Sequence, residues 1–185
     1  MRTGGFVLTG GRSTRMGRDK ALLPYRGRTL VEWVAEQARE VAGEVHLVGA
    51  PERYRHLEIP CIAERYAGSG PLSGIEAALR EGGAAWSLVL ACDMPGVDVP
   101  FLNELVAGVG PDVDVVVAVN DSGQDEPLCA VYGAQALPAV QQALAAGLYR
   151  ARDVLAALRV RRVAAPAKGL IRNVNTDEEW AAWIR

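Results

Sequence analysis

The pattern of hydrophobic and polar positions changes its period near residue 30. Residues 6–9 form a short apolar run of β type, whereas over residues 30–41 apolar positions recur every three or four residues, which is the spacing of one helix face. Thr29 precedes this stripe with Glu32 three positions later, the spacing of a capping box, and Gly43 follows as a stop signal. The chain is therefore expected to open with a strand, a loop and a helix.

The same alternation continues through the chain. Residues 87–91 form a run without polar alternation, which is typical of a strand buried on both faces in a parallel sheet. Further strands are expected at 44–48, 59–63, 113–119 and 128–132, and further helices at 73–81, 99–107, 135–146, 151–158 and 176–184. Residues 166–173 are expected to form a loop with room for a short strand. The pattern predicts a doubly wound, Rossmann-like α/β fold, with a mostly parallel sheet and helices on both faces.

Length and composition favour a single domain over residues 1–185, because half of the residues are apolar and suffice for an ordinary core. The alternation becomes looser after residue 120, which predicts an antiparallel edge in the second half. With 20 basic and 22 acidic residues, the chain has no global field for gripping nucleic acid or an anionic membrane. We expect neither as a partner.

Cellular location is expected to be cytoplasmic. The N-terminus has too short an apolar stretch for a signal peptide, and no run approaches the length of a membrane span. Cys61, Cys92 and Cys129 lie far apart inside apolar runs, which is typical of small buried residues in a reducing compartment.

The loop after the first strand combines glycines with basic residues. Gly10 and Gly11 lack a Cβ, so the backbone there can approach a ligand closely and present amide groups to an anion. Arg15 can fork two phosphate oxygens, and Lys20 adds a mobile point charge. The loop is neither a Walker A motif nor a dinucleotide fingerprint. It indicates a triphosphate site, or else a Gly-rich turn with solvated charges.

A carboxylate follows the buried run 87–91. Asp93 stands just before Met94-Pro95, where proline ends the strand because it lacks a donor. A carboxylate fixed at the rim of a sheet is a natural Mg²⁺ ligand, since this ion combines one or two carboxylates with substrate phosphates and water. The alternative role is a cap of the next helix.

Three other segments carry candidate chemistry. The Gly/Ser/Pro loop at 68–74 either shapes its backbone to bind a flat nucleotide base or forms a tight connection between a strand and a helix. Asn173 and Asn175 stand beside the last helix, where Asn175 or Thr176 is the N-cap. The later third carries arginines that either hold an acceptor phosphate or form a solvated face: Arg150, Arg152, Arg159, Arg161 and Arg162.

Together these motifs resemble the molybdenum cofactor guanylyltransferases. The resemblance runs almost end to end, over Leu8-Thr9-Gly10-Gly11 with Arg15-Met16-Gly17 and Asp19-Lys20, then Gly70-Pro71-Leu72-Ser73-Gly74, Cys92-Asp93, and Asn173-Val174-Asn175-Thr176. The first motif is shared with a wider nucleotidyltransferase group that includes sugar-phosphate and molybdopterin cytidylyl enzymes. The short length and the closing Asn-Val-Asn-Thr favour the guanylyl branch.

The resemblance implies transfer of GMP from GTP to Mo-molybdopterin, with release of pyrophosphate and Mg²⁺ as cofactor. It implies that Arg15, Lys20 and Asp93 are catalytic, with Arg15 and Lys20 on phosphates and Asp93 on the metal. The implied nucleotide-binding residues are Leu8, Thr9, Gly10, Gly11, Lys20, Glu64, Gly70, Pro71, Leu72 and Asp93, and the implied acceptor-binding residues are Arg150, Asn173 and Asn175. Residues 1–110 would form the nucleotide-binding half and residues 111–185 the acceptor-binding half.

The chain departs from the family pattern at three positions. Ala50 stands where the family has an asparagine that contacts nucleotide. At the family's aspartate before the Gly-Pro-Leu loop, ungapped alignment gives Ala63 and a one-residue deletion gives Glu64. We favour Glu64, because a carboxylate can accept from the N1–H and exocyclic amine of guanine. Glu126-Pro127 stands where many relatives have His-Pro, so the acceptor can differ too.

Two alternatives stay open at the level of sequence. One is a nucleotidyltransferase that uses CTP or another phosphorylated acceptor, and the other is a nucleotide-binding module without catalysis. The expected protein partners are enzymes that supply or receive molybdopterin in transient contacts, and the expected oligomeric state is a monomer.

Overall fold

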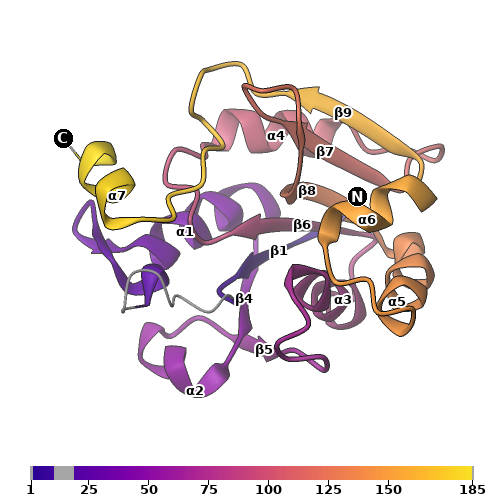
Figure 1. Ribbon diagram of the computed structural model, residues 1–185, viewed down its shortest axis with the longest axis horizontal. Helices are drawn as coiled ribbons and strands as arrows, with labels where there is room; N and C mark the ends of the chain where they lie inside the picture. Colours follow the sequence, from indigo (N-terminus) through magenta and orange to yellow (C-terminus); the bar gives the residue numbers. More distant parts are fainter. Residues whose placement is uncertain (1, 11–18, 185) are drawn as a thin grey trace.

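The computed structural model describes residues 2–10 and 19–184, and it folds around one seven-stranded sheet (Figure 1). The strands are β1 (Thr3–Leu8), β4 (Val45–Gly49), β5 (Cys61–Ala63), β6 (Trp86–Ala91), β7 (Val115–Val119), β8 (Asp125–Gly133) and β9 (Val160–Ala164). Their order is β5-β4-β1-β6-β8-β7-β9. The pairs β5/β4, β4/β1, β1/β6 and β7/β9 are parallel, and β8 is antiparallel to both β6 and β7. The predicted α/β class with a mostly parallel sheet is confirmed.

Helices cover both faces of this sheet. They are α1 (Leu30–Ala42), α2 (Pro51–Tyr54), α3 (Pro71–Glu81), α4 (Val99–Ala107), α5 (Leu137–Ala145), α6 (Ala151–Val154) and α7 (Asp177–Trp183). Short 3-10 turns occur at Lys20–Leu22, Arg55–Leu57, Ala134–Ala136 and Leu155–Ala157. One apolar cluster joins α1 and α4 to the sheet and the other joins α3, α5 and α6 to it. Residues 6–8 of β1 and 88–90 of β6 alternate between the two clusters, as expected for side chains on a strand.

The predicted helix boundaries are confirmed where capping residues next to the helix determine them. Thr29 and Glu32 form the expected capping box of α1, and Gly43 ends this helix with φ of 77°, a conformation that glycine adopts without strain. Thr176, not Asn175, is the N-cap of α7, again in a capping box. Asn175 is thereby left to make another contact.

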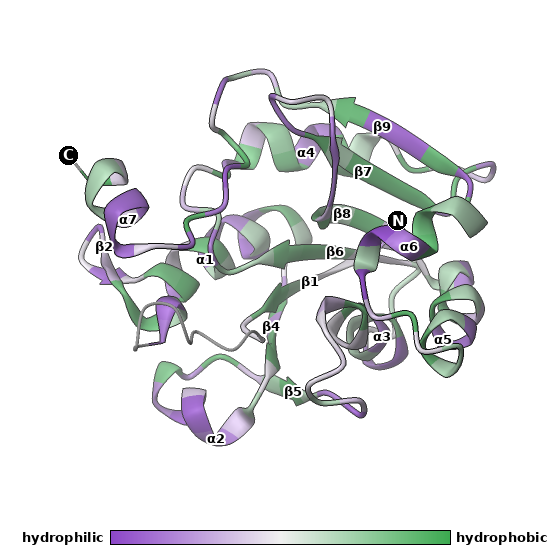
Figure 2. Cartoon of the chain, viewed as in Figure 1, coloured by the Kyte–Doolittle hydropathy of each residue, from purple (hydrophilic) through white to green (hydrophobic). Residues whose placement is uncertain are grey.

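The looser pattern after residue 120 predicted an antiparallel strand at the edge of the sheet, and this prediction was wrong. β8 lies inside, because β7 and the unpredicted strand β9 continue the sheet beyond it. Figure 2 shows hydrophobic residues along β6, β7 and β8, but hydrophilic residues in the middle of β9. Charged side chains on an exposed edge strand hinder its pairing with other chains. β9 therefore lacks the apolar pattern by which an inner strand is recognised in a sequence.

Other elements were not predicted, and some local expectations were only partly met. The short hairpin of β2 (Pro24–Tyr25) and β3 (Arg28–Thr29), and the single turn α2, are too short to produce a period. Residues 166–173 contain no strand. Cys92 and Cys129 are buried as expected, but Cys61 is only half-buried, because it lies on the short edge strand β5. Within residues 2–10 and 19–184, no helix is long and apolar enough to span a membrane.

Candidate active site

A cavity of about 610 Å³ opens where β1, β5 and β6 end. Carboxyl ends of parallel strands are the usual ligand-binding edge of open α/β sheets, and the volume suits a small-molecule site. The cavity is lined by residues that follow these strands, by the start of α3, by β8 and by the segment before α7: Leu8, Thr9, Gly10, Asp19, Lys20, Ala21, Arg53, Glu64, Gly68, Gly70, Pro71, Ala91, Cys92, Asp93, Met94, Glu126, Leu128, Asn173 and Asn175.

Lys20 joins three distant segments of the chain at the centre of the cavity. Its Nζ donates to Asp93 Oδ2 at 3.0 Å and to Asn175 Oδ1 at 3.0 Å. The backbone amide of Val174 donates to the Asp93 carbonyl at 2.9 Å, which ties the segment before α7 to the end of β6. The Lys20 and Asp93 side chains are 19% and 16% exposed, so their attraction is screened less than that of a surface pair.

Asp93 also has a carboxylate oxygen that no described residue contacts by a hydrogen bond. This oxygen, Oδ1, is buried. A buried carboxylate oxygen without a partner is costly, and a bound cation would satisfy it. The described residues contain no cluster of three or more His, Cys, Asp or Glu side chains that could hold a metal without a substrate. The donor set therefore fits an ion that completes its shell with substrate phosphates and water, as Mg²⁺ does.

Asp19, which precedes Lys20, is fixed from three directions. Its Oδ1 accepts from the Ala21 amide at 3.1 Å, and its Oδ2 accepts from the Tyr54 hydroxyl at 3.0 Å and pairs with Arg53 at 2.9 Å. Burial raises the pKa of the Tyr54 phenol, which keeps it a proton donor. This network orients the short helical turn that carries Lys20.

Glu64 also lines the cavity, and its carboxyl lies beside the backbone that follows β1. A Cβ built on Gly10 would lie 3.6 Å from Glu64 Oε1, and one built on Gly74 would lie 3.2 Å from the same atom. Burial raises the pKa of the Glu64 carboxyl. The neighbouring Ala63 ends β5 with its side chain exposed and is not part of the cavity wall.

Comparisons with known proteins show the family of this chain. The family model described as a MobA-like NTP transferase domain matches residues 5–163. The chain belongs to this family. A probable molybdenum cofactor guanylyltransferase of Nostoc sp. is 34% identical over 181 residues, which cover 95% of this chain and 87% of the relative. Another, from Pelotomaculum thermopropionicum, is 36% identical over 184 residues, which cover 95% of this chain and 88% of that protein.

A solved structure has the same fold. The molybdopterin-guanine dinucleotide biosynthesis protein A of Archaeoglobus fulgidus superposes with a TM-score of 0.79 at 26% sequence identity. The superposition covers 97% of this chain and 95% of that chain. The chain therefore shares its overall architecture with this structure.

Most of the predicted site residues of this MobA-like protein meet at the cavity. Lys20, Asp93 and Asn175 are in direct contact. The other predicted residues that line the same cavity are Leu8, Thr9, Gly10, Glu64, Gly70, Pro71 and Asn173. Gly11 and Arg15 lie outside the described residues.

Two predicted residues are placed differently. The Leu72 side chain is fully buried in the core of α3 and is not part of the cavity wall. Arg150 is exposed at the start of α6 and does not line the cavity, although Arg152, two residues on, donates to the Asp125 carbonyl at 2.9 Å.

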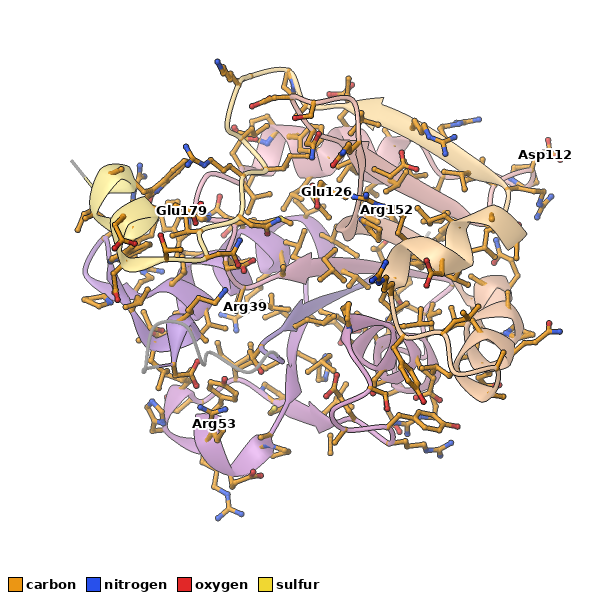
Figure 3. The ribbon with its side chains drawn as sticks, in the orientation of Figure 1. Arg39, Arg53, Asp112, Glu126, Arg152 and Glu179 are labelled. Atoms are coloured by element: carbon orange, nitrogen blue, oxygen red, sulfur yellow. The ribbon has the colours of Figure 1, made fainter. Side chains whose placement is uncertain are left out.

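Sequence reasoning missed Arg53 and Tyr54 in this site. Both belong to the single-turn helix α2, and Figure 3 shows Arg53 on this turn, below the sheet in that view. The signal available in the sequence was Pro51, which favours the first turn of a helix, directly after the predicted strand at 44–48. A turn this short has no hydrophobic period, so its contact with Asp19 was not predictable.

Gly70 fixes the path of the loop that leads into α3. Its φ is 72°, and a Cβ there would lie 2.7 Å from the backbone oxygen of Tyr149. We expect Gly70→Ala to lower the free energy of unfolding by about 2 kcal/mol, since it combines left-handed strain with a backbone clash. Chemical denaturation measures this loss. Gly110→Ala is the matched control, because nothing lies within 4 Å of its Cβ position, and an equal loss in both variants would contradict the expected clash.

Proposed function

We propose that this protein is a Mg²⁺-dependent molybdenum cofactor guanylyltransferase, which transfers GMP from GTP to Mo-molybdopterin and releases pyrophosphate. The observation that carries the proposal is the Lys20–Asp93 ion pair in a cavity at the carboxyl edge of the sheet. It brings together a lysine ammonium group that can bind phosphate and a carboxylate whose second oxygen has no hydrogen-bond partner among the described residues. The names of the relatives support the choice of GTP and molybdopterin.

The reaction is an in-line displacement at phosphorus. A terminal phosphate oxygen of the acceptor forms a bond to the α-phosphorus of GTP, and the bond from this phosphorus to the bridging oxygen of pyrophosphate breaks. The acceptor oxygen is already anionic, so no protein base is needed. Lys20 binds phosphate oxygens and offsets the negative charge that gathers around the phosphorus, so that catalysis is mostly positioning and electrostatic stabilisation.

Asp93 would hold the Mg²⁺ ion through Oδ1, the buried oxygen that has no partner among the described residues. When bound, the ion neutralises phosphate charge and orients the triphosphate. Asn175 also contacts the lysine, because its side-chain oxygen accepts a hydrogen bond from Lys20 Nζ at 3.0 Å. Asn175 is therefore proposed to position the lysine, in addition to its predicted place on the acceptor side.

The guanine end is proposed to lie against Glu64. An ionised carboxylate accepts two hydrogen bonds, and the N1–H and exocyclic amine of guanine present two donors side by side. This pairing requires loss of the Glu64 proton, although burial raises the pKa of that carboxyl. Guanine affinity should therefore weaken as the pH is lowered through this raised pKa.

The test of the proposed function is the thermal stability of the protein with GTP, CTP, ATP and UTP, each with and without Mg²⁺. A ligand that binds only the native state at 100 times its Kd stabilises it by about 2.7 kcal/mol. We expect Mg²⁺-dependent stabilisation by GTP that declines at low pH. Stabilisation by CTP or ATP instead would reject guanine. Binding of GTP without pyrophosphate release on addition of molybdopterin would reject the transferase.

A further inference from the structure

We propose that Glu126 is the acceptor-selecting residue, a carboxylate that recognises the amino-pyrimidinone edge of a pterin as Glu64 recognises that of guanine. The inference rests on the proposed function and extends it to the second substrate. It starts from the observation that the cavity has a carboxylate on each side of the Lys20–Asp93 pair.

The strand order fixes the positions of the two carboxylates. Glu64 follows β5, Asp93 follows β6, and Glu126 is near the start of β8. Because β8 runs antiparallel to β6 with Leu90 opposite Cys129, the start of β8 lies at the carboxyl end of β6. Although Glu64 follows β5, its carboxyl reaches back over β1, because a Cβ built on Gly10 would lie 3.6 Å from Glu64 Oε1. β1 and β8 flank β6 in the sheet, so the two carboxylates lie roughly 10 Å apart along the edge, with the Lys20–Asp93 pair between them.

The surroundings of Glu126 suit a flat heterocycle that carries hydrogen-bond donors along one edge. Glu126 and Leu128 are two residues apart on β8, so they share one face of the sheet, and both line the cavity. Leu128 supplies an apolar surface beside the carboxylate. Pterins carry the same adjacent N–H and exocyclic amine as guanine, and a carboxylate is the acceptor pair that matches these two donors.

Glu126 is held in place for this role. The amide of Asn120 donates to Glu126 Oε1 at 2.7 Å, and no described residue forms a hydrogen bond with Oε2. The turn between β7 and β8 does not depend on Glu126, because Asn120 Oδ1 itself accepts from the amides of Ser122 and Gln124 at 2.9 and 3.1 Å. The Arg152 guanidinium, labelled with Glu126 in Figure 3, donates to the backbone carbonyl of Asp125, the residue before Glu126, but does not line the cavity.

The experiment compares two isosteric variants, Glu126→Gln and Glu64→Gln, by pyrophosphate release with Mo-molybdopterin and GTP titrated separately. Glutamine at 126 keeps an oxygen for the Asn120 donor but cannot accept both donors of a pterin. We expect Glu126→Gln to raise the KM for molybdopterin about 10- to 100-fold and to leave the KM for GTP unchanged. Glu64→Gln should show the opposite pattern.

The outcomes separate this inference from the proposed function. An active wild-type protein whose Glu126→Gln variant keeps its molybdopterin KM, or loses GTP affinity equally, would overturn the role of Glu126 alone. A wild-type protein that releases no pyrophosphate would overturn both. Binding gives a second readout that needs no turnover: 6-hydroxymethylpterin phosphate should bind the wild-type protein about tenfold tighter than its 2-oxo lumazine counterpart. Glu126→Gln should lose this preference and Glu64→Gln should keep it, and the reverse pattern would also reject the inference.

Discussion

Asp93→Asn is expected to reduce kcat on the order of 10³-fold, a loss of about 4 kcal/mol of transition-state stabilisation. Asparagine is isosteric, and its amide oxygen can still accept the hydrogen bond that Lys20 donates to Asp93 Oδ2. What disappears is the negative charge and the second carboxylate oxygen that would hold Mg²⁺. Steady-state pyrophosphate release at saturating GTP measures the loss.

The matched control for this change is Asp98→Asn. Asp98 caps α4 by accepting from the Phe101 amide at 3.0 Å, and it does not line the cavity. Asparagine is an equally good N-cap, so this variant should keep its activity. Full activity of Asp93→Asn, with an unchanged dependence on Mg²⁺, would exclude Asp93 as the metal ligand.

Lys20→Met is expected to lower kcat/KM for GTP about 100-fold, because it removes a charge that offsets the phosphates. The chain has only one other lysine, Lys168, which is exposed and does not line the cavity. Lys168→Met is therefore a matched control that should leave kcat/KM unchanged. An equal loss in both variants would contradict a specific role for Lys20.

The same lysine variant tests the ion pair by a measurement that needs no turnover. Lys20 donates to Asp93 Oδ2 at 3.0 Å, so its positive charge opposes a second cation at Oδ1 of the same carboxylate. We expect Mn²⁺ alone to bind Lys20→Met about tenfold tighter than the wild-type protein, and to bind Asp93→Asn more weakly. Calorimetric titration with Mn²⁺ distinguishes these opposite effects. Weaker Mn²⁺ binding in Lys20→Met would show that the lysine charge does not oppose the metal.

Much of the fold follows from local pattern. The apolar stripe, the capping box and the terminal glycine of α1 are all encoded within a few residues of one another, and the structure confirms each of them. The unbroken apolar run of β6 correctly indicated a strand buried on both faces. β9 was missed because an edge strand pairs on one side only, so its exposed positions carry arginines.

The candidate site was predictable in its residue types but not in its contacts. Gly10, Lys20 and Asp93 stand out because glycine, a basic residue and a carboxylate follow strands where ligands collect. Nothing local assigned Glu64 rather than Ala63 to the cavity, since the two are adjacent in sequence and the end of β5 decides which one faces inward. The ion pair of Arg53 with Asp19 and the hydrogen bond from Tyr54 to Asp19 were likewise not predictable from the sequence.

By itself, the sequence determined the succession of strands and helices, their caps and the chemical character of the loops that follow the strands. Those features depend on residues within a few positions of one another, and periodicity reports them directly. Only the tertiary structure decided that Lys20 meets Asp93 and Asn175, which are 73 and 155 positions away. It also put Glu64 and Glu126 on opposite sides of this group. Such contacts arise from the order and direction of strands in the sheet, which a local pattern does not encode.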